Sequence, residues 1–529
     1  MNSLAVNSEP LSNLCHEIGD SRRLIVASNR GPVEHHVSED GSLSATRGGG
    51  GVAIALSALN KYVDSTWVAC AMGDGDRYAA HKADHRTIET FVDGDRHSLR
   101  YVLLPRETYD KHYSVFCNPF LWFFQHNMWD HLYDPAIDHE VWDAWEDGYV
   151  PANECFAQTV VAEASREDLP LIMLHDYHLY LTPGLVRSQL PYAVLQHFTH
   201  IPWPPPKRWM LLPRPVCRTI LESLCSCDIV GLQTKRDVHN FLLTCETYLR
   251  EARVDHEMQT VRLNGRETKV NAYPISVDVA GLEKLANSWE VKDHERRLHS
   301  LLGKKTIMRV DRVDLSKNII RGFEAYDMLL ARHPELIGQV NFLAFLVPSR
   351  TNIREYQEYT REVFGLVDRI NMKYGREGWR PITVFYEHNY PQAIAGMRLY
   401  DVLLVNALAD GMNLVAKEGP IVNGRDGVLI LSQKAGAHEQ LRDGAVSIVP
   451  EDVEGTARAL YEALFMPPEE RRMRVKIMRE RISEEDIGHW FWGQLNDLQR
   501  VARWSSLQPS YRHYSTPLAM PRQQTLAIP

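Results

Sequence analysis

The chain has 529 residues, of which 44% are hydrophobic and 24% charged, and its formal net charge is -9 at pH 7. This composition is typical of a globular protein with at least two domains. The negative charge gives no reason to expect a nucleic-acid partner, and no apolar run approaches the roughly 18 residues of a membrane span. Since the first residues show no basic and apolar leader, we expect a cytoplasmic protein that does not bind a membrane.

The cysteines and histidines give little evidence for a metal. Eight cysteines are scattered through the chain, and the close pair Cys225 and Cys227 lacks the spacing of a zinc site. His175 and His178 have no third ligand in view, which is weak support for metal binding. We therefore expect reduced thiols, no metal and no cofactor.

The first half of the chain predicts a series of buried strands, each followed by polar residues. Residues 1–20 are polar and aperiodic, and we expect them to be disordered. The apolar runs that predict strands are 24–27, 66–70, 171–174, 192–195, 229–232 and 271–277. Helical patterns cover 219–228 and the residues from about 233 to 252.

A glycine run, Gly48 to Gly51, precedes the helical pattern VAIALSAL. Gly48, Gly50 and Ala53 satisfy the G-x-G-x-x-A pattern of dinucleotide-binding turns. A long insertion separates them from the first strand, and no acidic residue lies on a clear second strand, so the match is weak. We interpret the run as a flexible loop whose amides approach a ligand, which disfavours an NAD-dependent enzyme.

Aromatic and histidine side chains cluster after several of these strands. Tyr113 and Trp122 lie in the aromatic segment 109–129, where they either line a ligand pocket or belong to the core. The segments 175–178 and 197–200 each follow an apolar run. In open α/β sheets ligands bind at the carboxyl ends of the strands, so both segments are candidates for a site.

A second series of apolar runs predicts a second domain. The runs are 307–310, 340–346, 382–385, 402–405 and 427–431, and helical patterns lie between them. The sequence therefore predicts an α/β protein with two doubly wound domains and a ligand in the cleft between them. We expect the first domain at 21–278, the second at 279–482, a helix at 483–506 that packs back on the first domain, and a disordered tail at 507–529.

The stretch DGMNLVAKE, from Asp410 to Glu418, follows the apolar run 402–405 and predicts a helix that opens at Gly411. The first amides of a helix attract an anion such as a diphosphate, and a glycine allows close approach. Glu418 would lie on the same helix face, about 12 Å from Asp410 at roughly 1.5 Å per residue. The alternative is an ordinary turn with Asp410 as the helix cap and Lys417 and Glu418 in solvent.

Three basic residues follow the strands of the second domain. Arg312 and Lys317 lie in RVDRVDLSKN, and Arg350 follows the run 340–346. Cations at the carboxyl ends of these strands can complement a diphosphate. Surface salt bridges are the alternative for each residue, although three strand ends that converge on one cleft favour a site.

Together these motifs resemble one known family. They are SNRGP at Ser28, the glycine run, LHDYHL around Asp176, HIPWP at His200, RVDRVDLSKN, PSR at Arg350, DGMNLVAKE, and GVLILSQKAGAHEQL from Gly427. In this order they resemble the trehalose-6-phosphate synthases, which are retaining glycosyltransferases of the GT-B fold with two Rossmann-like domains. The resemblance extends from about Leu24 to Trp504.

The resemblance implies transfer of glucose from UDP-glucose or GDP-glucose to glucose 6-phosphate, with roles for individual residues. The implied catalytic residues are Arg312, Lys317, His200 and Asp410. The implied donor-binding residues are Gly51, His200, Arg312, Lys317, Asp410, Gly411, Met412, Asn413, Leu414 and Glu418. The implied acceptor-binding residues are Arg30, Tyr113, Trp122, Asp176 and Arg350.

Two departures from the family leave alternatives open. Cys70 ends the run that begins at Trp67, where many members have a second tryptophan, and Asn318 replaces a common glycine in SKN. Asn318 makes the chain resemble related pseudo-glycosyltransferases. The alternatives are therefore a transferase with glycerol 3-phosphate or a cyclitol phosphate as acceptor, and a non-catalytic sugar-phosphate sensor. The donor base and a homo-oligomer also stay open.

Overall fold

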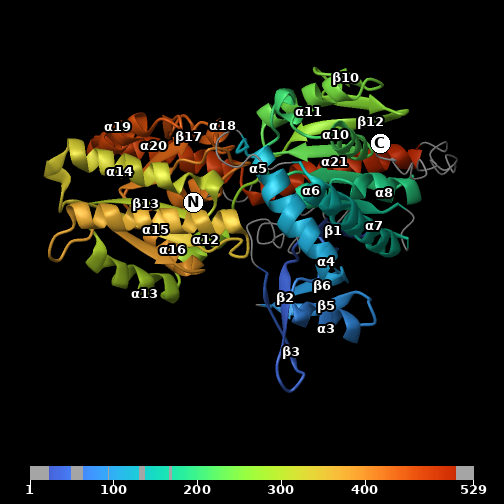
Figure 1. The fold of residues 1–529 in the computed structure, drawn as a ribbon, viewed down its shortest axis with the longest axis horizontal. Coiled ribbons are helices and arrows are strands. Elements are labelled where there is room, and N and C mark those ends of the chain that lie inside the picture. The colour runs from blue at the N-terminus through green and yellow to red at the C-terminus, as the bar shows by residue number, and fades with distance from the viewer. Residues whose placement is uncertain (1–22, 49–62, 93, 130–136, 166–168, 508–529) are drawn as a thin grey trace.

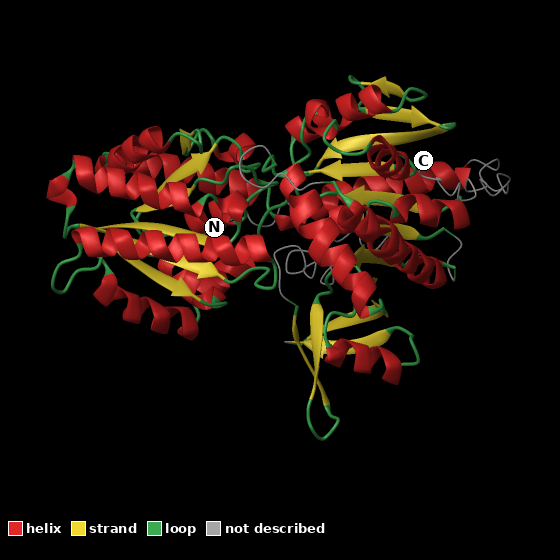
Figure 2. Ribbon diagram, in the orientation of Figure 1, coloured by secondary structure: helices red, strands yellow, loops and turns green. Residues whose placement is uncertain are grey.

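A computed structural model describes residues 23–48, 63–92, 94–129, 137–165 and 169–507. Two α/β lobes lie side by side, and in each of them helices cover both faces of a central sheet (Figures 1 and 2). We expect disorder in the segments 1–20 and 507–529. Residues 1–20 and 508–529 lie outside the described residues, as do Gly49 to Gly51 of the glycine run, whereas Leu507 ends a helix.

The first lobe is built on a ten-stranded sheet with the order β10-β11-β12-β9-β8-β7-β1-β4-β6-β5. Its central strands are parallel, and β5, β10 and β11 pair antiparallel with their neighbours. The strands are β1 Leu24–Ser28, β4 Ser65–Cys70, β5 Ile88–Val92, β6 Asp95–Val102, β7 Leu171–His175, β8 Val194–Phe198, β9 Ile229–Leu232, β10 Arg253–Asp255, β11 Thr260–Leu263 and β12 Arg266–Ala272. A separate hairpin of β2 Val33–Val37 and β3 Leu43–Arg47 projects from this lobe (Figure 1).

The second lobe is built on a parallel six-stranded sheet with the order β15-β14-β13-β16-β17-β18. Its strands are β13 Lys305–Arg312, β14 Val340–Val347, β15 Ile382–Tyr386, β16 Val402–Val405, β17 Val428–Ser432 and β18 Val446–Ile448. Every residue of β16 is buried. A parallel strand covered on both faces requires such an unbroken apolar run, which is why these strands were predictable.

The helices follow the strands in chain order. In the first lobe they are α3 Asp74–Lys82, α4 Arg106–Asp110, η2 Lys111–Leu121, α5 Trp122–Gln125, α6 His139–Asp143, η3 Ala144–Tyr149, α7 Val150–Ala164, η4 Tyr177–Leu179, α8 Thr182–Gln189, α9 Pro206–Trp209, α10 Arg214–Leu224 and α11 Lys235–Tyr248. After the first lobe follow α12 Val279–Ala286, α13 Trp289–Leu298, η5 His299–Leu301, η6 Leu315–Lys317, α14 Ile319–Arg332, η7 Pro334–Leu336, α15 Arg354–Tyr374, α16 Tyr390–Met397, α17 Val415–Val422, α18 His438–Leu441, α19 Val453–Phe465, α20 Pro468–Glu484 and α21 Ile487–Leu507.

Several predicted boundaries were wrong. The strand expected at 192–195 begins at Val194, and the helix expected at 219–228 is α10, which ends at Leu224. The strand expected at 271–277 is β12, which ends at Ala272, because only its residues up to there pair with β9. The helix expected at 483–506 is α21, which begins at Ile487 because α20 extends to Glu484.

The chain passes between the lobes twice, and the two passages touch. The first passage follows β12, and the second lies between α20 and α21. The amide of Ile487 donates to the carbonyl of Val277 across 3.1 Å. Beyond this point α21 lies against β8 of the first lobe, where Trp490 Nε1 donates to the Tyr273 carbonyl at 3.0 Å (Figure 1). The domain boundaries stay predictions.

Candidate active site

The motif 410–418 lies where β16 ends, but its helix begins later than expected. Helix α17 starts at Val415, whereas we predicted a start at Gly411. Asn413 has a φ of 77°, which is incompatible with an α-helix that runs through it. The predicted placement of Glu418 on the same helix face as Gly411 was therefore wrong.

Gly411 packs directly against the backbone of the first lobe. A Cβ atom on this glycine would lie 1.8 Å from the carbonyl oxygen of His200, which belongs to the first lobe. A Cβ atom on Gly436 would in turn lie 1.8 Å from the carbonyl oxygen of Gly411. Three backbone segments thus stack without room for side chains, so packing of the lobes requires the glycine that we had assigned to anion approach.

Lys317 and Asp410 form a buried ion pair at the carboxyl ends of β13 and β16. The Lys317 ammonium donates to the Asp410 carboxylate, which also accepts from Asn413 Nδ2 at 3.0 Å. Burial opposes ionisation of Asp410, but the Lys317 charge outweighs this and holds the pKa of the carboxyl below its ordinary value. The pair places a fixed positive charge directly at the motif.

Arg350 and Trp122 meet between the two lobes. The guanidinium carbon of Arg350 lies 4.1 Å from the centre of the Trp122 ring, and that of Arg312 lies 5.3 Å from it. Trp122 opens helix α5, which lies at the boundary of the lobes (Figure 1). Two cations from the second lobe therefore face one indole of the first lobe, an arrangement favourable for cation–π contact.

Arg30 and Tyr113 extend this cluster within the first lobe. Arg30 Nη2 lies 3.5 Å from the Tyr113 hydroxyl, and the Tyr113 ring stacks on His178 with ring centres 5.9 Å apart. Burial would raise the pKa of Tyr113, but Arg30 and Arg350 outweigh burial and lower it. The structure thus brings together the residues to which we assigned an acceptor phosphate.

Asp176 and His200 connect the two predicted binding sets. The His200 amide donates to Asp176 Oδ1 at 3.2 Å, and the rings of His200 and His175 hydrogen-bond across 3.2 Å. Burial raises the pKa of Asp176 to about 7 and lowers the pKa of His200 to about 3. Asp176 also has a φ of 74°, a strained conformation for a residue with a side chain, which is frequent at functional sites.

The remaining residues that we predicted to bind the sugar donor lie in α17 or in the residues just before it. Glu418 Oε1 accepts from the Tyr390 hydroxyl at 2.9 Å, and burial raises the pKa of this carboxyl. Met412 is buried, and Leu414 directly precedes α17 without a side-chain capping hydrogen bond. Lys417, which one alternative placed in solvent, is buried and donates to the Ile275 carbonyl at 2.6 Å. Gly51 lies outside the described residues.

Sequence reasoning missed three residues that organise this site. Asp314 has a fully buried carboxylate and accepts from Arg350 Nη1 at 2.7 Å. The hydroxyls of Tyr356 and Tyr177 also contact Arg350. Asp314 lies in the quoted motif RVDRVDLSKN, so the chain contained a signal, but only the fold shows which cation the carboxylate holds.

The departure at Asn318 has a structural explanation. Asn318 has φ 56° and ψ 41°, the left-handed region that glycine and asparagine tolerate best. Its Nδ2 donates to the carbonyls of Asn406 at 3.0 Å and Pro450 at 2.8 Å. The side chain therefore ties two loops of the second lobe together. At the other departure, Cys70 is buried at the end of β4.

We expect Asn318→Gly to lower the free energy of unfolding by about 1 to 2 kcal/mol, because it removes these hydrogen bonds but keeps the backbone conformation. The transfer activity that the family resemblance implies should stay near that of the unchanged chain. Asn318→Ala should cost about 1 kcal/mol more, since alanine resists the left-handed region. Thermal unfolding and acceptor assays check this, and a change of preferred acceptor would contradict it.

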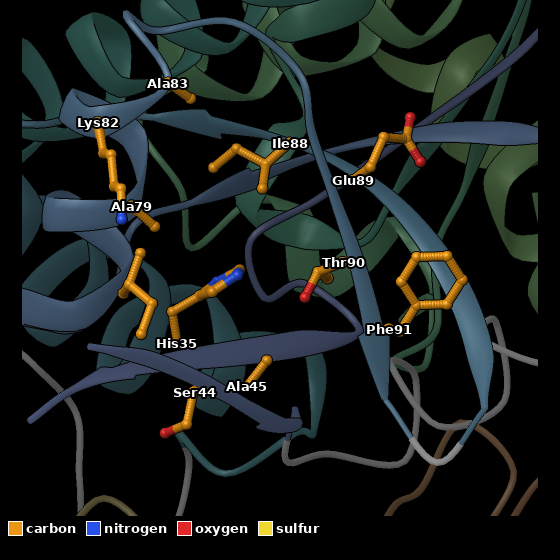
Figure 3. Close-up of a pocket in the computed structure, with 11 residues that line it drawn as sticks. His35, Ser44, Ala45, Ala79, Lys82, Ala83, Ile88, Glu89, Thr90 and Phe91 are labelled. Carbon is orange, nitrogen blue, oxygen red and sulfur yellow. The ribbon is translucent and has the colours of Figure 1, made fainter.

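A separate pocket of about 380 Å³ lies away from these residues, between the β2–β3 hairpin, α3 and β5 (Figure 3). Its lining residues are His35, Leu43, Ser44, Ala45, Ala79, Lys82, Ala83, Ile88, Glu89, Thr90 and Phe91. No residue predicted for the donor or the acceptor lines it. Within the described ranges, no cluster of three or more His, Cys, Asp or Glu is placed to hold a metal ion, and no helix is long and apolar enough to cross a bilayer.

Comparison with known proteins gives the family. The model of glycosyltransferase family 20 matches residues 22–500. The chain belongs to glycosyltransferase family 20. Among family members, it is 33% identical to a UDP-forming alpha,alpha-trehalose-phosphate synthase from Pichia angusta, over 90% of this chain and 99% of the relative.

Other family members differ in length. The chain is 31% identical to alpha,alpha-trehalose-phosphate synthase A from Dictyostelium discoideum over 93% of its own residues, but it spans only 64% of that relative's length. Solved structures of the family have the same fold. The Escherichia coli enzyme bound with UDP-2-fluoro glucose superposes with a TM-score of 0.75 at 28% identity, over 90% of this chain and 99% of that one.

The structure of a UDP-forming alpha,alpha-trehalose-phosphate synthase from Burkholderia xenovorans, in complex with glucose 6-phosphate, is also similar. It superposes with a TM-score of 0.76 at 28% identity, over 90% of this chain and all of that one. The GT-B fold that we predicted is therefore confirmed.

Proposed function

We propose that the chain transfers glucose, with retention of configuration, from UDP-glucose to glucose 6-phosphate and so forms α,α-trehalose 6-phosphate. The observation that carries the proposal is the meeting of two cation sets between the lobes. The acceptor set is Arg30 and Arg350, and the donor set is Arg312 and Lys317. Arg350 faces Trp122, and Lys317 pairs with Asp410, while a hydrogen bond joins His200 and Asp176. Two phosphorylated substrates need two such sets side by side. The names of the relatives, which are UDP-forming, support the choice of donor.

In the proposed reaction, a hydroxyl oxygen of the acceptor forms a bond to the anomeric carbon of the donor glucose. The bond from that carbon to the diphosphate breaks, and the departing diphosphate takes the hydroxyl proton on the same face of the sugar. Arg312 and Lys317 stabilise the charge that develops on the diphosphate. Arg30, Arg350 and Trp122 hold the acceptor phosphate and thereby orient the attacking hydroxyl.

The proposal includes no metal. Lys317 is already fixed by Asp410, so its charge needs no reorganisation as the diphosphate leaves. Full activity after treatment with a chelator supports this part of the proposal, and loss of activity that added magnesium restores would contradict it.

The test is nucleotide release from UDP-glucose and from GDP-glucose, each with and without glucose 6-phosphate. We expect release of UDP only when the acceptor is present, together with a disaccharide phosphate whose anomeric couplings identify an α,α linkage. Release with glycerol 3-phosphate or a cyclitol phosphate in place of glucose 6-phosphate would favour a related transferase. Binding without release from either donor would favour a sugar-phosphate sensor. The cytoplasmic location and a homo-oligomer stay predictions.

A further inference from the structure

Asp314 is the point at which both lobes and both cation sets meet. Its Oδ2 accepts from Arg350 Nη1 at 2.7 Å and from the Tyr356 hydroxyl at 3.2 Å. Its Oδ1 accepts from the amide of Ser316 at 3.0 Å and from Trp122 Nε1 at 3.4 Å. The carboxylate therefore has donors from its own loop, from the next strand end and from the opposite lobe.

The charges around Asp314 keep it ionised although no part of it is exposed. Burial alone would raise the pKa of this carboxyl, but Arg350, Arg312 and Lys317 together hold the pKa well below its usual value. A buried carboxylate that is paired in this way is costly to disturb, because removal of its charge leaves the cations without a partner.

Arg350 needs this support because its backbone and side chain are both constrained. Its φ is 46°, in the left-handed region that a residue with a side chain adopts only where the surroundings hold it. Its Nη1 group donates to Asp314 and Tyr356, and Nη2 lies 3.4 Å from the Tyr177 hydroxyl. Within the described residues, the buried Nε has no hydrogen-bond partner. A guanidinium that is held in one place beside the Trp122 ring suits recognition of a phosphate group.

We propose that Asp314 is a positioning residue for the acceptor: it holds Arg350 against the Trp122 ring, so that the phosphate of glucose 6-phosphate binds only when the two lobes are in contact. Asp314 itself touches no substrate. Trp122 Nε1 reaches Asp314 across the boundary of the lobes, and the same indole covers Arg350. One carboxylate thus fixes both sides of the phosphate site. This inference rests on the proposed function.

The experiment compares Asp314→Asn with the unchanged protein at varied glucose 6-phosphate and saturating donor. We expect the KM for glucose 6-phosphate to rise about 10- to 100-fold, the loss expected when one charge-assisted hydrogen bond to a binding group is removed. The kcat and the KM for the donor should change far less. A variant that was only destabilised would lose active enzyme without this rise in KM.

Asp401→Asn is the matched control, since Asp401 is another buried carboxylate of the second lobe. It accepts from Lys305 Nζ at 3.2 Å and from the Thr306 amide at 3.0 Å. This variant should lower the melting temperature and leave the KM for glucose 6-phosphate unchanged. If Asp314→Asn does not fold, Tyr356→Phe takes its place, because the Tyr356 hydroxyl contacts both Arg350 and Asp314.

Binding of glucose 6-phosphate and of inorganic phosphate, measured by calorimetry without donor, separates the two proposals. If the unchanged protein binds glucose 6-phosphate and transfers glucose, but the variant keeps the same KM and phosphate affinity, the role of Asp314 is wrong and the proposed function stands. If the unchanged protein neither binds nor uses glucose 6-phosphate, the proposed function fails. A raised KM together with weakened phosphate binding supports the inference.

Discussion

Lys317→Ala should lower the turnover number by about 100- to 1000-fold, the cost of removing one donor that stabilises charge in the transition state. The ammonium is buried and fixed by Asp410. Removal of a flexible surface lysine would lower the turnover number little, because water and salt screen its charge. The KM values should change less than kcat, because the charge on the diphosphate grows as the bond to glucose breaks. Steady-state kinetics with both substrates varied measures this.

The same change should also lower the free energy of unfolding by about 3 kcal/mol, because it leaves the Asp410 carboxylate buried without its cation. Assays must therefore be made well below the melting temperature of the variant. Lys305→Ala is the matched control: Lys305 pairs with Asp401 at 3.2 Å in the same lobe, away from the motif. Lys305→Ala should lower the free energy of unfolding slightly and leave the turnover number unchanged. An unchanged turnover number in Lys317→Ala would refute the catalytic role.

Gly411→Ala should disrupt the site by disturbing the contact between the lobes, although it adds only a single methyl group. The new Cβ atom would lie 1.8 Å from the His200 carbonyl oxygen, a distance that real Cβ atoms do not show, and both groups are backbone. The lobes must then move apart at the point where Gly411 packs against the His200 backbone. Since a misplacement of about 1 Å can reduce a rate about 100-fold, we expect a loss of that order in kcat/KM.

Overpacking of this kind should also destabilise the protein by about 1 to 3 kcal/mol. Gly365→Ala is the matched control because it lies within α15, where a Cβ atom would meet only the end of the Arg369 side chain at 3.6 Å. Alanine there should stabilise the protein by about 0.5 to 1 kcal/mol. Normal kcat/KM in Gly411→Ala would show that the contact with His200 is not needed for activity.

The buried parallel strands were predictable, and the exposed ones were not. Strands β1 and β16 are buried along their whole length, so their sequences are unbroken apolar runs. In β5, by contrast, exposed and partly buried residues alternate, and β10 is largely exposed. Such edge strands exist because a neighbour offers hydrogen bonds, which a local pattern does not reveal. The same reason explains why the hairpin β2–β3 was missed.

The candidate site was predicted unevenly for a similar reason. The residues at strand ends, such as Lys317 and Arg350, followed from the sheet topology together with the family resemblance. The late start of α17 did not, because Asn413 leaves the helical region at a place where Gly411 packs against the His200 carbonyl, which is far away in the sequence. Asp314 was missed because its burial depends on Trp122 from the other lobe. Tertiary contact, rather than local propensity, decides these positions.

The two passages of the chain between the lobes restrict how the lobes can move. A single linker acts as a pivot point, about which one body turns in any direction. Two passages joined by the hydrogen bond from Ile487 to Val277 restrict the relative motion of the lobes more than one linker would. Beside the first passage, Gln233 accepts from the Ile275 amide and contacts the His200 carbonyl. His200 is therefore anchored close to the place where the lobes are joined, and we expect relative motion of the lobes to displace it less than residues far from the two passages.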